Sequence, residues 1–273
     1  MKLPKEFLKS AEKYNYDLSL LQKSRNPHLY IEKNKILSVS GNSGLKIITK
    51  SFSQGVKIKL LIKKDIKIKK PIFFCFGILE KRGKQLIFPE ITLKENSEAR
   101  ILSHCTFPKA KDIFHKMETE INLEKGAKLF YQEKHYHGEN FGTEVLANFK
   151  ISIGQSAFFE NEFILDKGSI GKLKIFLEAV LKKDAFCKIT NKIIGKGKKD
   201  EVEVYDKISL NGKNSSSLNK LKGAIVKGGK MFFKGETIAG KRAENAKGHI
   251  DCQEIIVGKS IAQSIPIVTV KNQ

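Results

Sequence analysis

The sequence predicts a mainly β protein, a right-handed parallel β-helix (solenoid) core that follows a short helical N-terminal segment. From about residue 70, short apolar runs such as KPIFFCFGI, LIFPEITL and DEVEVYDKISLNG recur between turns that contain Gly, Asn or Lys-Gly. Strands spaced by roughly 8–12 residues are typical of a sandwich, a barrel or a solenoid. Turn phrases such as LEKGAKL and VKGGKMFF recur before strands, which favours a solenoid of stacked coils. A sandwich is the alternative, because Asn211-Gly212 is a hairpin-type turn.

The first 65 residues follow a different pattern from the rest of the chain. Apolar residues in 4–24 recur at near-helical spacing with Lys and Glu on the other face, so a helix is expected there. Asn26-Pro27 should end that helix, because the residue before a proline avoids the helical conformation. Residues 28–65 alternate apolar and polar side chains, which predicts strands. The predicted domains are therefore 1–65, a helix plus strands, and 66–273, the β-helix core.

The composition predicts a cytosolic protein with reduced thiols. The sequence has no run of 18 or more apolar residues, so no membrane span is expected. The N-terminus, MKLPKEFLKSAEKYNYD, is charged and lacks the apolar core of a signal peptide. The cysteines show no close pairing of the kind found in zinc ribbons or disulfide frameworks. They are Cys75, Cys105, Cys187 and Cys252.

The formal charge of +22 allows two interpretations. It could be the electrostatic footprint of a nucleic-acid or anionic-membrane partner. However, lysines are spread along the whole chain and only four of the 51 basic residues are arginines, although arginine is the residue of choice for phosphate forks. Compositional bias, or an acidic protein partner, therefore fits better than nucleic acid. A polysaccharide-cleaving enzyme would need a pair of carboxylates on one face, and no such constellation is apparent.

Two cysteines carry the chemical information: Cys105 in SHCTFP and Cys252 in ENAKGHIDCQEIIVG. A thiolate is a strong nucleophile and a soft ligand for iron, zinc or sulfane sulfur. On a strand, residues two apart share a face, so Cys252 shares its face with Glu254, and Cys105 shares its face with Ser103 but not with His104. The alternative for each is an ordinary buried thiol. Cys75 and Cys187 lie within apolar runs and are predicted to be core residues.

His135 and His137 form a second candidate group. If this segment is extended, they lie on one face at a spacing that suits a metal pair, although a solvated His-Tyr-His turn fits equally well. The two candidate cysteines are 147 residues apart. Coils of roughly 22–25 residues would make about six steps, which separates these cysteines by about 30 Å along the axis. They therefore cannot share one metal within a monomer.

The strings around the two cysteines resemble the SufB/SufD family, the scaffold subunits of SUF-type iron–sulfur cluster assembly. LKGAIVKGGKMFFKGETIAGKRAENAKGHIDCQEIIVG resembles its C-terminal signature, and Cys252 falls on the cysteine that holds the nascent cluster in SufB. ARILSHCTFP resembles the string around the sulfur-accepting cysteine, with Cys105 in register. His135 and His137 fall near a matching Gln and Trp. The family's Arg-x-Asn ahead of the first cysteine is replaced here by CFGIL, and the His-Tyr-His string departs from bacterial SufB.

The resemblance implies a short, archaeal-type SufB-like scaffold rather than an enzyme. It implies that Cys105 accepts sulfur and that a transient Fe–S cluster, most simply 4Fe–4S, is built at Cys252 with Glu254 beside it. It also implies as partners a SufC-type ATPase, a cysteine desulfurase or other sulfur donor, and a second copy or a SufD-like paralogue. The family continues beyond the equivalent of Gln273, so we expect this chain to be a trimmed form. The alternative is a basic solenoid that binds nucleic acid or protein without cluster chemistry.

Overall fold

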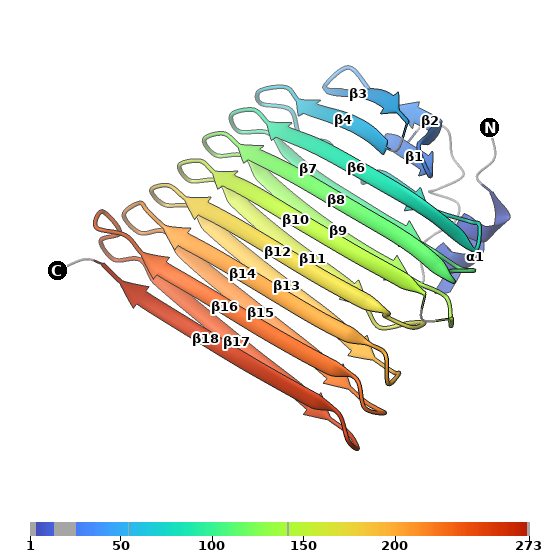
Figure 1. Cartoon of the computed structure of the whole chain (residues 1–273). Helices are drawn as coiled ribbons and strands as arrows, with labels where there is room; N and C mark the ends of the chain where they lie inside the picture. The colour runs from blue at the N-terminus through green and yellow to red at the C-terminus, as the bar shows by residue number, and fades with distance from the viewer. Residues whose placement is uncertain (1–3, 14–25, 54, 141, 272–273) are drawn as a thin grey trace.

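Two stacked parallel sheets form the core of the computed structural model, which describes residues 4–13, 26–53, 55–140 and 142–271 (Figure 1). The first sheet, sheet A, has the order β17-β15-β13-β11-β9-β7-β5-β1-β2, and sheet B has the order β18-β16-β14-β12-β10-β8-β6-β4-β3. The chain alternates between the sheets, and every pairing from β4 and β5 onward is parallel. The β-solenoid prediction is therefore confirmed. The sandwich alternative is wrong, because Asn211-Gly212 leads from β14 in one sheet to β15 in the other.

The strands of sheet A are β1 (His28–Glu32), β2 (Lys35–Ser40), β5 (Ile72–Gly77), β7 (Glu98–Thr106), β9 (Lys128–Tyr136), β11 (Phe158–Leu165), β13 (Phe186–Gly195), β15 (Ser216–Ile225) and β17 (Lys247–Ile256). Those of sheet B are β3 (Leu45–Phe52), β4 (Gly55–Ile62), β6 (Arg82–Leu93), β8 (Asp112–Leu123), β10 (Thr143–Ile153), β12 (Lys172–Leu181), β14 (Glu201–Leu210), β16 (Lys230–Ala239) and β18 (Ile261–Val270).

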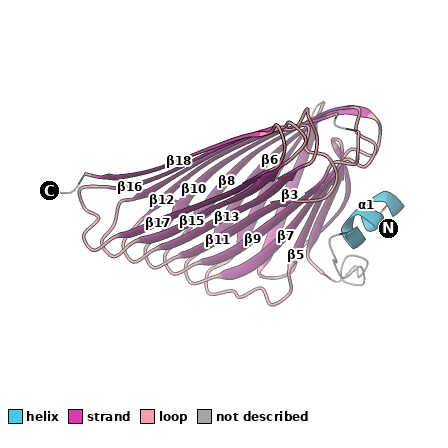
Figure 2. Ribbon diagram, turned by 90° about the horizontal axis from the view of Figure 1, so that it is seen from below, coloured by secondary structure: helices cyan, strands magenta, loops and turns pink. Residues whose placement is uncertain are grey.

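Each turn of the solenoid uses two strands, one in each sheet, and takes about 30 residues. Cys105 aligns with His135 on the next strand of sheet A, and Gly223 aligns with Glu254 further along the same sheet. The expected coil of 22–25 residues was therefore too short. Inward-facing side chains from both sheets alternate with outward ones and form one continuous apolar core. Figure 2 shows the two sheets face to face, with the connecting turns stacked along their edges.

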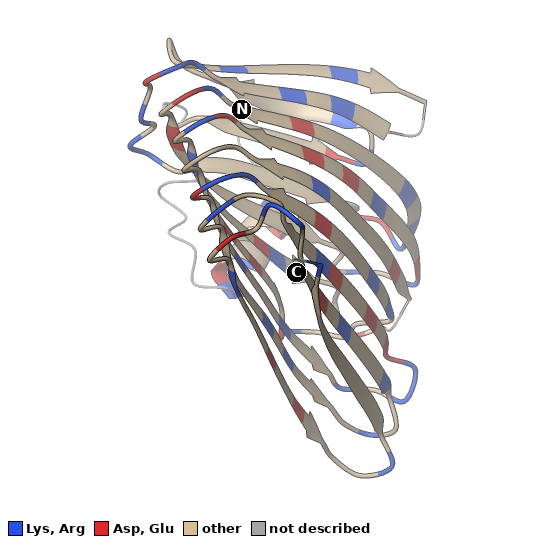
Figure 3. Ribbon diagram, turned by 90° about the vertical axis from the view of Figure 1, so that its left-hand side faces the viewer, with Lys and Arg blue, Asp and Glu red and all other residues tan. Residues whose placement is uncertain are grey.

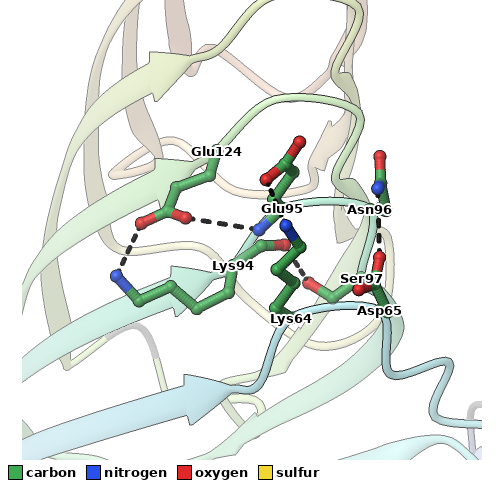
Figure 4. A network of polar contacts seen from close by, with 7 residues as sticks. All are labelled: Lys64, Asp65, Lys94, Glu95, Asn96, Ser97 and Glu124. Atoms are coloured by element: carbon green, nitrogen blue, oxygen red, sulfur yellow. Dashed lines mark hydrogen bonds and ion pairs between the residues drawn. The ribbon is translucent and has the colours of Figure 1, made fainter.

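The stacked turns explain why this sequence closes the same bend repeatedly. One residue in each turn has a positive φ, the conformation that Gly, Asn and Asp adopt most easily. These residues are Asn96, Gly126, Ser156, Asp184, Asn214 and Asn245. Their side chains form hydrogen bonds from turn to turn: the Asn96 amide donates to Asp65 at 3.0 Å (Figure 4), and the Asn214 amide donates to Asp184 at 2.9 Å. The turns thus set the register of the strands that follow them.

A short helix covers the outer face of sheet A near the start of the solenoid. Helix α1 (Lys5–Lys13) buries Phe7 and Ala11 against Phe73 and Cys75, which point outward from β5. The helix predicted for residues 4–24 is confirmed for this part, and its remainder lies outside the described residues. Strands β1 to β4 pair directly with the solenoid through β5 and β6. The domain boundary between residues 65 and 66 stays a prediction.

The outer faces of both sheets mix the two signs of charge. Lysines on one turn pair with glutamates on the next, as in Lys59–Glu90 at 3.0 Å and Lys188–Glu160 at 2.7 Å. Figure 3 shows basic and acidic positions interspersed on the strands rather than segregated. Such exposed pairs contribute at most about 1 kcal/mol each, so the fold depends mainly on the apolar interior. No helix among the described residues is long and apolar enough to cross a membrane.

Candidate functional site

Cys105 lies inside the solenoid, at the end of β7 where the chain turns from sheet A into sheet B. Its side chain is fully buried and faces inward with those of Ser103 and Phe107, as predicted. The parallel register sets Cys105 beside His135 and Ser103 beside Glu133 on β9. The first candidate cysteine therefore belongs to a cluster of buried polar side chains, contributed by consecutive turns.

Hydrogen bonds fix the protonation of the two histidines. The Ile170 carbonyl can only accept, so His137 donates to it from Nδ1 at 2.9 Å. The pKa of His137 is lowered to about 3 by burial, so the ring is neutral and its Nε2 is an acceptor. His135 must therefore donate from Nδ1 to that Nε2, at 3.2 Å. Burial lowers the pKa of His135 to about 3 as well, so its own Nε2 carries a free lone pair.

That lone pair points at a carboxyl group. His135 Nε2 lies 2.6 Å from Glu133 Oε1, and the Tyr131 hydroxyl donates to Glu133 Oε2 at 3.1 Å. Burial raises the pKa of Glu133 to about 8, so at neutral pH the carboxyl group keeps its proton and donates it to His135. Burial, followed by the nearby Glu133, also raises the pKa of the Cys105 thiol well above its usual range. Left to itself, this cluster is electrically neutral.

A third histidine reaches the cluster from the opposite sheet. His115, near the start of β8, places Nε2 4.0 Å from Cys105 Sγ, and Glu133 Oε1 lies 3.9 Å from the same sulfur. The ligand atoms of Cys105, Glu133 and His135 all lie within 4.8 Å of one another. This is the one grouping of three or more Cys, His, Asp or Glu side chains among the described residues with the spacing of a metal site. Sequence reasoning missed Glu133 and His115, because only the register and the cross-sheet packing bring them to Cys105.

His104 points away from this cluster, as predicted from the alternation along the strand. Its Nε2 lies 2.8 Å from the Ser10 hydroxyl of α1, and the Thr106 hydroxyl donates to that same oxygen at 2.7 Å. Cys75 is also buried on this outer side, beneath α1, while Cys187 lies in the main core. Both fit their predicted place as core residues.

Cys252 lies on β17, in the last turn of the solenoid, and is partly exposed. It shares its face with Ile250 and Glu254, as predicted. Burial raises the pKa of both the Cys252 thiol and the Glu254 carboxyl. Glu254 Oε1 is buried and has no hydrogen-bond partner among the described residues. The second candidate site is thus a thiol beside a carboxyl group, within a groove at the uncovered end of the sheet.

The structure groups His135 and His137 with Cys105 rather than with Cys252. Five strand steps separate β7 from β17 in sheet A. At about 4.8 Å a step, the two cysteines are about 24 Å apart along the axis, less than the expected 30 Å because each turn is longer. They cannot share a metal ion within one chain.

A buried polar group lies between the two cysteines. Asp206 points inward from β14 and accepts a hydrogen bond from the Asn191 amide at 2.9 Å. Burial raises the pKa of Asp206 to about 7. Asn219, one turn closer to Cys252, is buried too, and neither its Oδ1 nor its Nδ2 has a hydrogen-bond partner in the part of the chain that the structure describes. No motif in the sequence marked these residues, although each is a polar side chain at an inward position of an otherwise apolar strand.

Comparison with known proteins places this geometry in a family. Residues 83–273 match the family described as SUF system FeS cluster assembly, SufBD core domain. An iron–sulfur cluster assembly SufBD family protein of Methanocaldococcus jannaschii is 38% identical over 248 residues, which cover 91% of this chain and 78% of the relative. A SufBD family protein of Pyrococcus horikoshii is 30% identical over 261 residues, covering 96% and 78%. One from Archaeoglobus fulgidus is 27% identical over 201 residues, covering 73% and 52%. The chain belongs to the SufBD family and has a role in iron–sulfur cluster assembly.

Proposed function

We propose that this protein is a SufB-like scaffold, on which sulfur accepted at Cys105 is built into a 4Fe–4S cluster at Cys252. Glu254 acts as the neighbouring ligand. The partners are a SufC-type ATPase, which supplies the ATP hydrolysis that the scaffold lacks, and a cysteine desulfurase or another sulfur donor. A second copy, or a SufD-like paralogue, completes the cluster site. The cluster is cargo that is passed on.

A line of buried polar side chains between the two cysteines carries this proposal. Each strand of sheet A from β7 to β17 contributes at least one inward-facing polar residue to an interior that is otherwise apolar. From β7 to β17 these are Cys105, Glu133, Asn161, Asn191, Asn219 and Cys252. Successive strands are about 4.8 Å apart, so a small polar species can move from one of these groups to the next.

Several groups on this line lack partners within the protein. The buried Asp206 Oδ1, Asn161 Nδ2 and both polar side-chain atoms of Asn219 have no hydrogen-bond partner among the described residues. Leaving a buried polar group unpaired costs about 1–3 kcal/mol, so a chain selected for stability alone would place apolar residues here. A path for sulfur or iron explains why polar residues occupy these positions.

The sulfur step requires the Cys105 thiolate to attack the outer sulfur of a donor persulfide. A new S–S bond forms on Cys105, the donor's S–S bond breaks, and the donor leaves as a thiolate. Each sulfane sulfur then needs two electrons from an external reductant to become sulfide in the cluster. Because Cys105 is fully buried, the donor can reach it only when a covering segment opens.

The last turn supports assembly with a second subunit. Strands β17 and β18 are the terminal strands of their sheets and therefore leave backbone hydrogen-bonding groups free along one edge. Val268 aligns with the buried Thr237 of the preceding turn but is 62% exposed. A further turn of β-structure from a second subunit would cover this edge and would supply more ligands beside Cys252.

Anaerobic reconstitution with ferrous iron and sulfide tests the assembly site. Wild type should take up iron and sulfide and show the visible absorption of a 4Fe–4S cluster, and Cys252→Ser should lose it. Cys187→Ser, which alters a buried thiol away from the site, is the matched control and should retain the cluster. Full cluster loading of Cys252→Ser would overturn the assignment.

Sulfur transfer is tested separately with a desulfurase and free cysteine. Trypsin digestion and mass spectrometry should find the added sulfur on Cys105 in wild type. Asn219→Leu should keep that sulfur but form less cluster at Cys252, while reconstitution with free sulfide stays normal. Equal rates of cluster formation from persulfide in Asn219→Leu and wild type would refute the interior path.

A further inference from the structure

We propose that Cys105, His115, Glu133 and His135 bind one divalent transition-metal ion of borderline softness, Zn(II) or Fe(II), within the solenoid. This goes beyond the proposed scaffold function, which needs the Cys105 thiol but no resident ion. The cluster proposed at Cys252 is about 24 Å away along the axis, so the two sites can be tested independently.

The donor atoms have the spacing of a contracted tetrahedral site. In a zinc site with bonds of about 2.0–2.3 Å, neighbouring ligand atoms lie about 3.3–3.8 Å apart. Cys105 Sγ lies 4.0 Å from His115 Nε2 and 3.9 Å from Glu133 Oε1. His135 Nε2 lies 2.6 Å from that same oxygen. Shifts of less than about 1 Å would bring four donors around one ion, and β7, β8 and β9 supply them from both sheets.

The surrounding hydrogen bonds orient these donors as they do in known metal sites. A metal-binding histidine usually donates its other N–H to a carbonyl or another acceptor, which fixes the ring. Here the chain from the Ile170 carbonyl through His137 to His135 leaves the lone pair of His135 Nε2 facing the cluster. Tyr131 holds Glu133 in the same way by donating to its second oxygen. His137 is thus a positioning residue rather than a ligand.

His115 provides an independent indication. Its ring is fully buried, and Nδ1 has no hydrogen-bond partner among the described residues. Its ring contacts Phe107 and His135, with centroids 5.1 and 6.1 Å away. An imidazole with this little hydrogen bonding is unfavourable inside a protein, and coordination through Nε2 would give it a strong interaction.

The electrostatics favour a dication. One thiolate and one carboxylate balance two positive charges, so the filled site is neutral, and an unbalanced charge would be costly at this depth. The mixed sulfur, nitrogen and oxygen donors suit Zn(II) or Fe(II) better than magnesium or calcium, which prefer oxygen ligands.

Cobalt(II) is the direct probe, because tetrahedral thiolate-bound cobalt has characteristic charge-transfer and visible bands. We expect metal-free wild type to bind one equivalent with these bands, and zinc to displace it. Cys105→Ser should lose the charge-transfer band, and His115→Phe should lose the tetrahedral bands. Both Cys187→Ser and Cys252→Ser should retain the full spectrum. His137→Phe should weaken cobalt binding about 10- to 100-fold, the usual cost of losing an outer hydrogen-bond partner.

A measurement on wild type alone keeps the test valid if a variant fails to fold. X-ray absorption at the zinc edge should show one sulfur at about 2.3 Å and nitrogen or oxygen ligands at about 2.0–2.1 Å. The absence of cobalt bands in wild type, their persistence in Cys105→Ser, or their loss in Cys252→Ser alone would each overturn the proposal. Loss of the cluster in Cys252→Ser with cobalt binding intact would uphold both assignments, and each can fail without the other.

Discussion

Replacing Asp206 with Asn should stabilise the protein in a pH-dependent way. The carboxyl group is fully buried, and its pKa rises from 3.8 to about 7 on folding. Below about pH 4 the group is protonated in both the folded and the unfolded state and costs nothing. Between about pH 4 and 7 the unfolded chain loses its proton while the folded chain keeps it, so stability falls by about 1.4 kcal/mol per pH unit.

The full penalty above pH 7 is therefore about 4 kcal/mol. Asparagine has no charge to bury, and its oxygen can still accept the hydrogen bond from Asn191. Asp206→Asn should thus be more stable than wild type by up to about 4 kcal/mol at pH 8, and by much less at pH 4. Urea unfolding followed by circular dichroism at both pH values measures the difference, and Asp184→Asn in an exposed turn is the control.

Two results would refute this reasoning. One is a variant that is no more stable than wild type at pH 8, and the other is a gain that is equally large at pH 4. If Asp206 belongs to the interior path, the stabilised variant should also transfer sulfur to Cys252 more slowly, because functional sites often retain groups that reduce stability.

Three further predictions concern packing and assembly. Gly171→Ala should destabilise by about 1–3 kcal/mol, because Gly171 has a φ of 71° and an added Cβ would collide with the Thr143 carbonyl; Gly228→Ala, also at positive φ but in open space, should cost less in the same thermal melt. Ser10→Ala should cost about 1–3 kcal/mol by removing hydrogen bonds from two buried side chains, and unchanged stability would contradict this. Val268→Asp should shift the protein towards monomer in sedimentation velocity, whereas Val180→Asp on an outer face should leave its assembly unchanged.

The sequence predicted the β-solenoid because alternation and turn residues are local signals, and both sheets retain them throughout. It underestimated the length of a turn because strands were counted singly, whereas one turn needs a strand in each sheet. The correct period is visible in the left-handed turn residues: Asn96, Gly126, Ser156, Asp184 and Asn214 recur about every 30 residues. A search for this spacing would have given the register directly.

The candidate site was predicted in part for the same reason. Strand alternation correctly placed Cys105 inward, His104 outward, and Cys252 on the face of Glu254. His115 could not be found in this way, because it approaches Cys105 across the gap between two sheets rather than along one strand. Asp206 was missed because an isolated acidic residue in a strand resembles an ordinary surface position until the register shows which way it faces.

The stacking of nearly equal turns has an evolutionary consequence for the two cysteines. Deleting a few residues from a strand would shift its register and turn inward side chains outward, so such changes are selected against. Deleting or duplicating a whole turn of about 30 residues preserves every facing and changes the axial distance by about 4.8 Å. Among relatives that keep both thiols, their separation should therefore vary in whole steps of this size, and intermediate spacings should be rare.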